Sequence, residues 1–227
     1  MPVEPFKARV AQLALAAAAA EGFALAGGNA LAAHGILSRP TQDVDLFSPQ
    51  PGGTGRVLDS VVAALIADGF EVKVVHGSAE PGADFAQLHV SCGGETTQLD
   101  LGRDWRAYDA VTLDIGPVLH LDDAVGAKVT ALLGRGLARD YIDVGAALTR
   151  YPRKRLLEMA FQRDSGLRVL DVVLAAQRLD HLPDEQFGRY DLNAEQIDEL
   201  RRRFADWPRD SGADQLAQRA HDLTHQA

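Results

Sequence analysis

The stretch FALAGGNALAAHGILSRPTQDVDLF, residues 23–47, carries the signals that decide the fold. Its first segment, FALAG, is short and apolar, which predicts a buried strand. Gly27 and Gly28 follow, and the alanine-rich residues after them predict a helix that begins at once and ends near a glycine. After an Arg-Pro step, the alternation in DVDLF (43–47) predicts a second strand.

Two acidic residues on the second strand suggest a metal site. Asp43 and Asp45 are two positions apart, so their side chains point to the same face of a strand. Neighbouring carboxylates repel each other, and a divalent cation removes that repulsion. Oxygen ligands alone favour Mg²⁺, with Mn²⁺ as the alternative. A DxD pair can also be two solvated aspartates at a strand end.

Two further features strengthen this interpretation. The turn at Gly27-Gly28 lets the backbone approach a ligand closely, and a helix start offers N–H groups to phosphate. Asp100, in TTQLDLG, lies near the end of a later strand. If that strand lies beside DVDLF, Asp100 joins the pair, and three carboxylates can hold two metal ions or activate a hydroxyl.

The regions around this stretch predict the rest of the first half. Residues 5–20 and 57–69 read as helices, and SPQPGGTG (48–55) reads as a loop. EVKVVHG, DFAQLHVSC and ETTQLDLG read as strands, the last two joined by a hairpin at Gly93-Gly94. Residues 111–118 suggest one short edge strand.

After Pro117 the pattern becomes helical. Five segments between 121 and 207 read as helices, with Asp122 or Asp123, Pro152 and Asn193 as their expected starts. We therefore expect an α+β protein with an α/β core over 1–117 and a helical region over 118–227 packed on it. Trp105 and Trp207 are expected to be packing residues.

Composition limits the class of protein. The formal charge of −9 does not suit binding to nucleic acid by bulk electrostatics, so any such contact needs a local basic patch. The single cysteine, Cys92, allows no intramolecular disulfide and is expected to be buried or half-buried. The apolar run at 11–20 is too short to span a membrane and is a poor signal peptide. A cytoplasmic protein without a membrane partner is expected.

These motifs together resemble the polymerase-β-type nucleotidyltransferase superfamily. The shared order is strand, Gly-Gly, helix, Arg-x-Thr-x-Asp-x-Asp (39–45) and a later strand with a third aspartate. Within it, the chain resembles the AbiEii/AbiGii toxin family, which includes the mycobacterial MenT toxins. KVTALLGRGLARDYIDVGAAL (128–148) is similar to that family's downstream motif of Lys, Arg-Asp and Asp, here Lys128, Arg139, Asp140 and Asp143.

The resemblance implies roles for these residues. It implies a polymerase-β-like core whose metal ligands are Asp43, Asp45 and Asp100. The nucleotide would be held by Gly27, Gly28, Asn29, Arg39, Thr41 and Lys128, and Asp140 would belong to the catalytic set. The superfamily usually has serine after the glycine, where this chain has Gly28 or Asn29.

The apolar neighbours of Lys128 in the sequence also predict an anionic partner for it. It lies in a helical segment among Ala, Val and Leu, where a lysine needs an anion. A triphosphate would serve, and Asp140 is the expected partner when no nucleotide is bound.

The expected activity is magnesium-dependent transfer of a nucleoside monophosphate from a nucleoside triphosphate to a hydroxyl. The family implies RNA as acceptor, foremost a tRNA 3′ end, or else a protein, and it implies a cognate antitoxin as partner. Two alternatives stay open. One is the same transfer to a small hydroxylated molecule such as an antibiotic, which the acidic charge favours. The other is a non-catalytic nucleotide-binding module.

Overall fold

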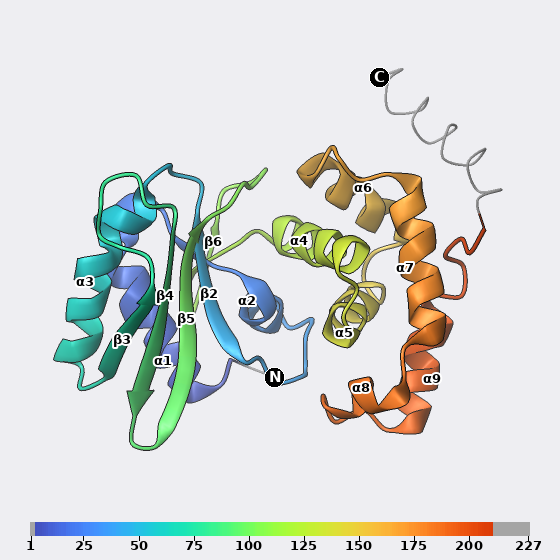
Figure 1. Cartoon of the computed structure of the whole chain (residues 1–227), viewed down its shortest axis with the longest axis horizontal. Helices are drawn as coiled ribbons and strands as arrows, with labels where there is room; N and C mark the ends of the chain where they lie inside the picture. The colour runs from blue at the N-terminus through green and yellow to red at the C-terminus, as the bar shows by residue number, and fades with distance from the viewer. Residues whose placement is uncertain (1–2, 211–227) are drawn as a thin grey trace. The chain divides into compact units, whose positions relative to one another are not determined.

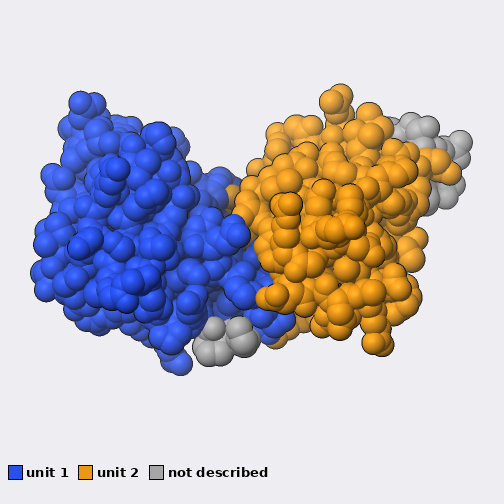
Figure 2. Space-filling view, turned by 60° about the horizontal axis from the view of Figure 1, so that its bottom comes forward, with its two compact units in different colours: residues 1–124 blue, residues 125–227 orange. Residues whose placement is uncertain are grey.

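The computed structural model describes residues 3–210, and the chain divides into two compact units. Unit 1 is Met1–Ala124 and unit 2 is Val125–Ala227, coloured separately in Figure 2. Residues 211–227, which the expected helical region includes, lie outside the described residues. No helix within 3–210 has the length and apolar character needed to cross a bilayer.

Unit 1 is the α/β part of the chain (Figure 1). Its elements are α1 (Pro5–Ala17), the 3₁₀ turn η1 (Ala19–Glu21), β1 (Ala24–Leu25), α2 (Gly27–Ala33), β2 (Asp43–Ser48), α3 (Gly53–Ala67), β3 (Glu71–His76), β4 (Phe85–Cys92), β5 (Glu95–Arg103), β6 (Val111–Leu113) and β7 (Gly116–Val118). In the described part of the chain these strands form a seven-stranded sheet in the order β3-β4-β5-β2-β1-β7-β6.

The sheet has one covered face and one polar face. Alternate residues of β2 and β5, such as Val44, Leu46, Leu99 and Leu101, are fully buried. Figure 1 shows α1 and α3 on one side of the sheet and α2 on the other. The three aspartates that alternate with them on these strands are only half-buried. The two-residue alternation of the sequence therefore separates the core from the candidate site.

Several predictions of elements are confirmed and two need correction. The strand at 43–47, the helix after Gly27-Gly28 and the hairpin at Gly93-Gly94 are all present. The residues at 111–118 form a two-stranded hairpin instead of one edge strand, and β7 pairs in parallel with β1. The expected loop at 48–55 contains the start of α3 at Gly53.

Unit 2 consists of helices, and the first turn of α4 belongs to unit 1. The helices are α4 (Leu121–Gly134), α5 (Ala138–Ala147), α6 (Arg153–Arg163), α7 (Val169–His181), α8 (Asp184–Gly188) and α9 (Ala194–Arg203). Asn193 caps α9 as predicted, because its side chain accepts a hydrogen bond from the Gln196 backbone N–H. The short α8 was not expected. Tyr141, Phe204 and Trp207 pack as one buried aromatic cluster.

Three side chains lie elsewhere than the sequence suggested. Cys92 is exposed, because it ends β4 next to the hairpin turn. Trp105 is 47% exposed, whereas Trp207 is buried as expected. The Asp123 carboxylate accepts hydrogen bonds from the backbone N–H groups of Ala107 and Tyr108, so it holds the loop after β5.

Candidate active site

The three predicted acids lie on the same face of the sheet. β2 and β5 run parallel, and their register pairs Asp45 with Asp100 and Asp43 with Gln98. Residues paired in this way share a face, and alternation adds Asp43 to it. All three aspartates are half-buried, while Val44, between Asp43 and Asp45, is fully buried in the core. We call Asp43, Asp45 and Asp100 the acid row.

Two glutamine side chains hold the carboxylate of Asp100. The Gln98 Nε2 donates to both carboxylate oxygens at 3.0 Å, and the Gln87 Nε2 donates to Oδ1 at 3.2 Å. Gln98 lies two residues before Asp100 on β5, and Gln87 lies directly opposite Asp100 on β4. Such donors stabilise the charged carboxylate and orient its oxygens. Neither glutamine was among the predicted site residues.

Asp45 lies against the start of α2. A Cβ on Gly27 would overlap the Asp45 Oδ2 and would be 2.8 Å from its Cγ. Gly27 also has a φ of +59°, which favours glycine. The second glycine is less constrained, because the closest atom to a Cβ on Gly28 would be the Thr41 methyl carbon at 2.8 Å, and its φ is not positive. Gly27 is therefore required for the Asp45 carboxylate to reach this helix start.

Asn29 joins the helix to the acidic strand. Its Nδ2 donates to the Asp43 backbone oxygen at 2.8 Å, and its Oδ1 accepts from the Thr41 hydroxyl at 2.7 Å. Asn29 is only 1% exposed. Lys7 donates to the Thr41 backbone oxygen at 2.6 Å. These contacts indicate that Asn29 and Thr41 position β2, and their contact with a nucleotide stays a prediction.

Arg39 lies in the loop before β2. Its Nη1 donates to the Pro40 backbone oxygen at 3.0 Å. This contact is with the adjacent residue and is exposed. The Arg39 guanidinium therefore belongs to the loop that leads into the N-terminal end of β2.

The donor set of the acid row fits a hard divalent cation. All three side chains offer carboxylate oxygens, and the strand register places them on one face. As the side chains stand, however, no three His, Cys, Asp or Glu residues within 3–210 gather closely enough to hold a metal ion. The backbone thus brings the expected ligands to one face, and a bound ion would have to draw their oxygens together.

The downstream motif forms two ion pairs within unit 2. The Lys128 Nζ lies 2.9 Å from the Asp143 Oδ2, and Asp143 is fully buried. Asp140 instead accepts from the Arg135 guanidinium at 2.8 and 3.0 Å and from the Leu137 backbone N–H at 3.0 Å. The predicted Lys128–Asp140 pair is therefore wrong, because Asp140 holds the first turn of α5.

Arg139 is the remaining basic residue of this motif. Its Nε is buried and has no hydrogen-bond partner among the described residues. A buried guanidinium nitrogen without a partner is costly, and an anion would satisfy it.

Comparison with known proteins agrees with the sequence motifs. A family model described as "Nucleotidyl transferase AbiEii toxin, Type IV TA system" matches residues 11–219. None of the curated proteins compared with the chain matches it.

Solved structures of similar fold cover nearly the whole chain. MenT4, a nucleotidyltransferase toxin from Mycobacterium tuberculosis, is 22% identical with a TM-score of 0.58, covering 95% of this chain and 90% of that one. A putative nucleotidyltransferase from Helicobacter pylori is 16% identical with a TM-score of 0.56, covering 97% and 96%. JHP933 from the same organism is 14% identical with a TM-score of 0.55, covering 98% and 97%. At these identities the likeness is evidence of a shared fold.

Proposed function

The chain belongs to the AbiEii nucleotidyl transferase toxin family, and we propose that it transfers a nucleoside monophosphate from a nucleoside triphosphate to a hydroxyl of RNA, foremost a tRNA 3′ end. The observation that carries the proposal is the register that pairs Asp45 with Asp100 on one face of the sheet. A cognate antitoxin is the expected protein partner.

The acids are assigned by their positions. Asp43 and Asp45 on β2, with Asp100 on β5, would hold Mg²⁺, or Mn²⁺ as the alternative. When bound, such an ion neutralises phosphate charge and aligns the attacking and leaving oxygens. Gln87 and Gln98 orient the Asp100 carboxylate, and we assign to Asp100 the acceptance of the proton of the acceptor hydroxyl.

The reaction balances with these groups. The acceptor oxygen forms a bond to the α-phosphorus, the bond from that phosphorus to the β-phosphate oxygen breaks, and pyrophosphate leaves. The proton of the hydroxyl passes to Asp100 and then to solvent. The chain contributes positioning and charge compensation.

The phosphates are assigned to the start of α2 and to basic residues. Gly27 lies beside Asp45 and Gly28 follows it in the first turn of α2, and first-turn N–H groups suit anions. Arg39 lies in the loop that leads into β2. Lys128 is assigned to phosphate binding on its sequence motif alone, and its ion pair with Asp143 keeps it ordered without a ligand.

The proposal is tested by incubating the full chain with each labelled triphosphate, Mg²⁺ and total RNA. Asp43→Asn and Asp45→Asn keep the side-chain shape and should reduce transfer to RNA by about 10²- to 10³-fold. Asp59→Asn is the matched control, because Asp59 is exposed on α3, away from the acid row. Thermal unfolding should be nearly unchanged in all three variants, since the acids are not core residues.

The outcomes separate the alternatives. Label in RNA that is lost in the two acidic variants supports the proposal. Label in small molecules alone refutes RNA as the acceptor and favours the antibiotic-type activity. Nucleotide binding without any transfer refutes catalysis and favours a non-catalytic module.

A further inference from the structure

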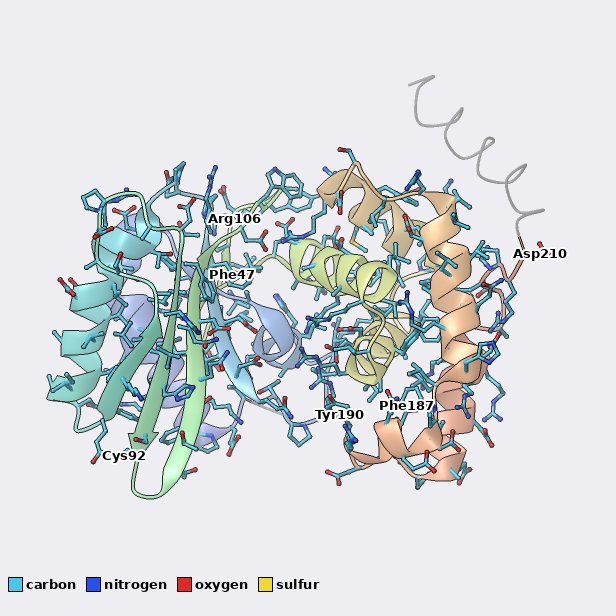
Figure 3. All side chains as sticks on the ribbon, in the orientation of Figure 1. Phe47, Cys92, Arg106, Phe187, Tyr190 and Asp210 are labelled. Atoms are coloured by element: carbon cyan, nitrogen blue, oxygen red, sulfur yellow. The ribbon has the colours of Figure 1, made fainter. Side chains whose placement is uncertain are left out.

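Next to the acid row, the same face of the sheet carries two aromatic side chains with a glycine between them. Phe47 follows Asp45 by two residues on β2, and Gly102 follows Asp100 by two residues on β5. The register pairs Phe47 with Gly102 across β2 and β5, and Gly102 with Phe85 across β5 and β4. We call Phe47, Gly102 and Phe85 the aromatic row. Figure 3 labels Phe47 near one end of the sheet and Cys92 at the opposite end.

The missing side chain of Gly102 lets the two rings cover it. A Cβ on Gly102 would lie 3.0 Å from two ring atoms of Phe47 and 3.7 Å from the Phe85 Cδ2. Gly102 is buried although it lies on the polar face, because the rings lie over it. Phe85 is nevertheless 47% exposed and Phe47 is half-buried. The two rings thus form an apolar surface that is still open to a flat ligand.

The position of this surface favours contact with the acceptor over contact with the triphosphate. On the β1 side, Asp45 abuts Gly27, so α2 closes the acid row there. On the other side lie β5 and β4, which carry Asp100, Gly102 and Phe85. One step of two residues along a strand is about 7 Å, so the rings lie about one nucleoside from Asp100. A hydroxyl activated at Asp100 would have its own base over the rings.

Resting on the function proposed above, we propose that Phe47 and Phe85 stack against the base of the terminal nucleotide of the RNA acceptor. Aromatic side chains bind single-stranded ends of RNA by stacking, which tolerates different bases because each has a π-face. Stacking requires no positive surface, so it accounts for RNA binding by a chain of net charge −9. The acceptor end is then held by its base at the rings and by its hydroxyl at Asp100.

The test compares two RNA acceptors that differ only in the terminal base, one normal and one abasic. For the parent chain, kcat/KM should fall about 5- to 150-fold when the base is missing, as expected for one stacked base. In Phe85→Leu, which keeps an apolar side chain but loses the aromatic face, the two acceptors should be used almost equally. The KM for the triphosphate should not change.

A second variant and a control keep the test independent of folding. Gly102→Ala would displace the Phe47 ring and should also reduce the preference for the normal base. Ile66→Ala removes a similarly exposed apolar side chain from α3, which covers the other face, and should retain the full preference. A terminal 2-aminopurine reports stacking directly, because its fluorescence should be quenched by the parent and not by Phe85→Leu.

The results distinguish this inference from the proposed function. If the parent labels RNA but Phe85→Leu discriminates against the abasic end as strongly as the parent does, the aromatic row does not bind the base, and the proposed function stands. If the parent labels no RNA at all, both the proposed function and the aromatic row fail.

Discussion

Substituting Gly27 by alanine tests the geometry of the acid row directly. The new Cβ would lie 2.8 Å from the Asp45 Cγ, and ordinary contacts begin at 3.4 Å, so the carboxyl carbon must retreat by at least about 0.6 Å. The overlapping Oδ2 must move further. A displacement of about 1 Å in a catalytic group can reduce the rate 10²-fold. We therefore expect Gly27→Ala to reduce transfer about 100-fold.

The backbone effect of this substitution can be measured separately. Gly27 and Gly93 both have a φ of +59°, but a Cβ on Gly93 meets nothing within 4 Å. Both alanine variants should lose about 1–2 kcal/mol of stability from the left-handed backbone. Only Gly27→Ala should also lose activity. Single-turnover transfer, measured well below both unfolding temperatures, gives the comparison. If Gly27→Ala transfers as fast as Gly93→Ala, Asp45 is not constrained as the structure indicates.

Two further predictions concern unit 2. Lys128→Met should destabilise the chain by about 3 kcal/mol because it removes the cation beside the buried Asp143. Adding Asp143→Asn should restore most of the stability, measured by urea unfolding, but should not restore transfer. Restored transfer in the double variant would exclude Lys128 from phosphate binding. Burial raises the pKa of Tyr141 to about 12 from 10.0. Only the unfolded chain then ionises this group between those values, so the contribution of Tyr141 to stability should be constant below pH 10 and fall by about 3 kcal/mol as the pH rises to 12. Tyr141→Phe should lack this contribution, and an identical pH profile in both proteins would contradict it.

Local patterns predicted much of the candidate site. The alternation in DVDLF placed Asp43 and Asp45 on one face, and β2 confirms the strand. The glycine pair at Gly93-Gly94 predicts a two-residue turn, and that turn alone sets Gln87 opposite Asp100. Gln98 follows from the same alternation, so both glutamines were within reach of sequence reasoning.

Other features depend on contacts that no local pattern contains. The parallel pairing of β2 with β5 joins strands separated by a helix and another strand pair, so only the folded sheet sets the register of Asp45 and Asp100. The glycine-rich composition at 51–55 hid the start of α3, because glycine is unfavourable in helices. Asp140 and Asp143 lie one turn apart on α5, so motif spacing could not tell which would pair with Lys128.

The parallel ladder between β2 and β5 has a consequence during protein synthesis. β2 leaves the ribosome well before β5, because α3, β3 and β4 lie between them in the sequence. Pairing between distant segments forms late in folding. A growing or truncated polypeptide that stops short of β5 therefore carries two carboxylates without their third. On the function proposed above, such a fragment lacks the complete acid row and would be inactive.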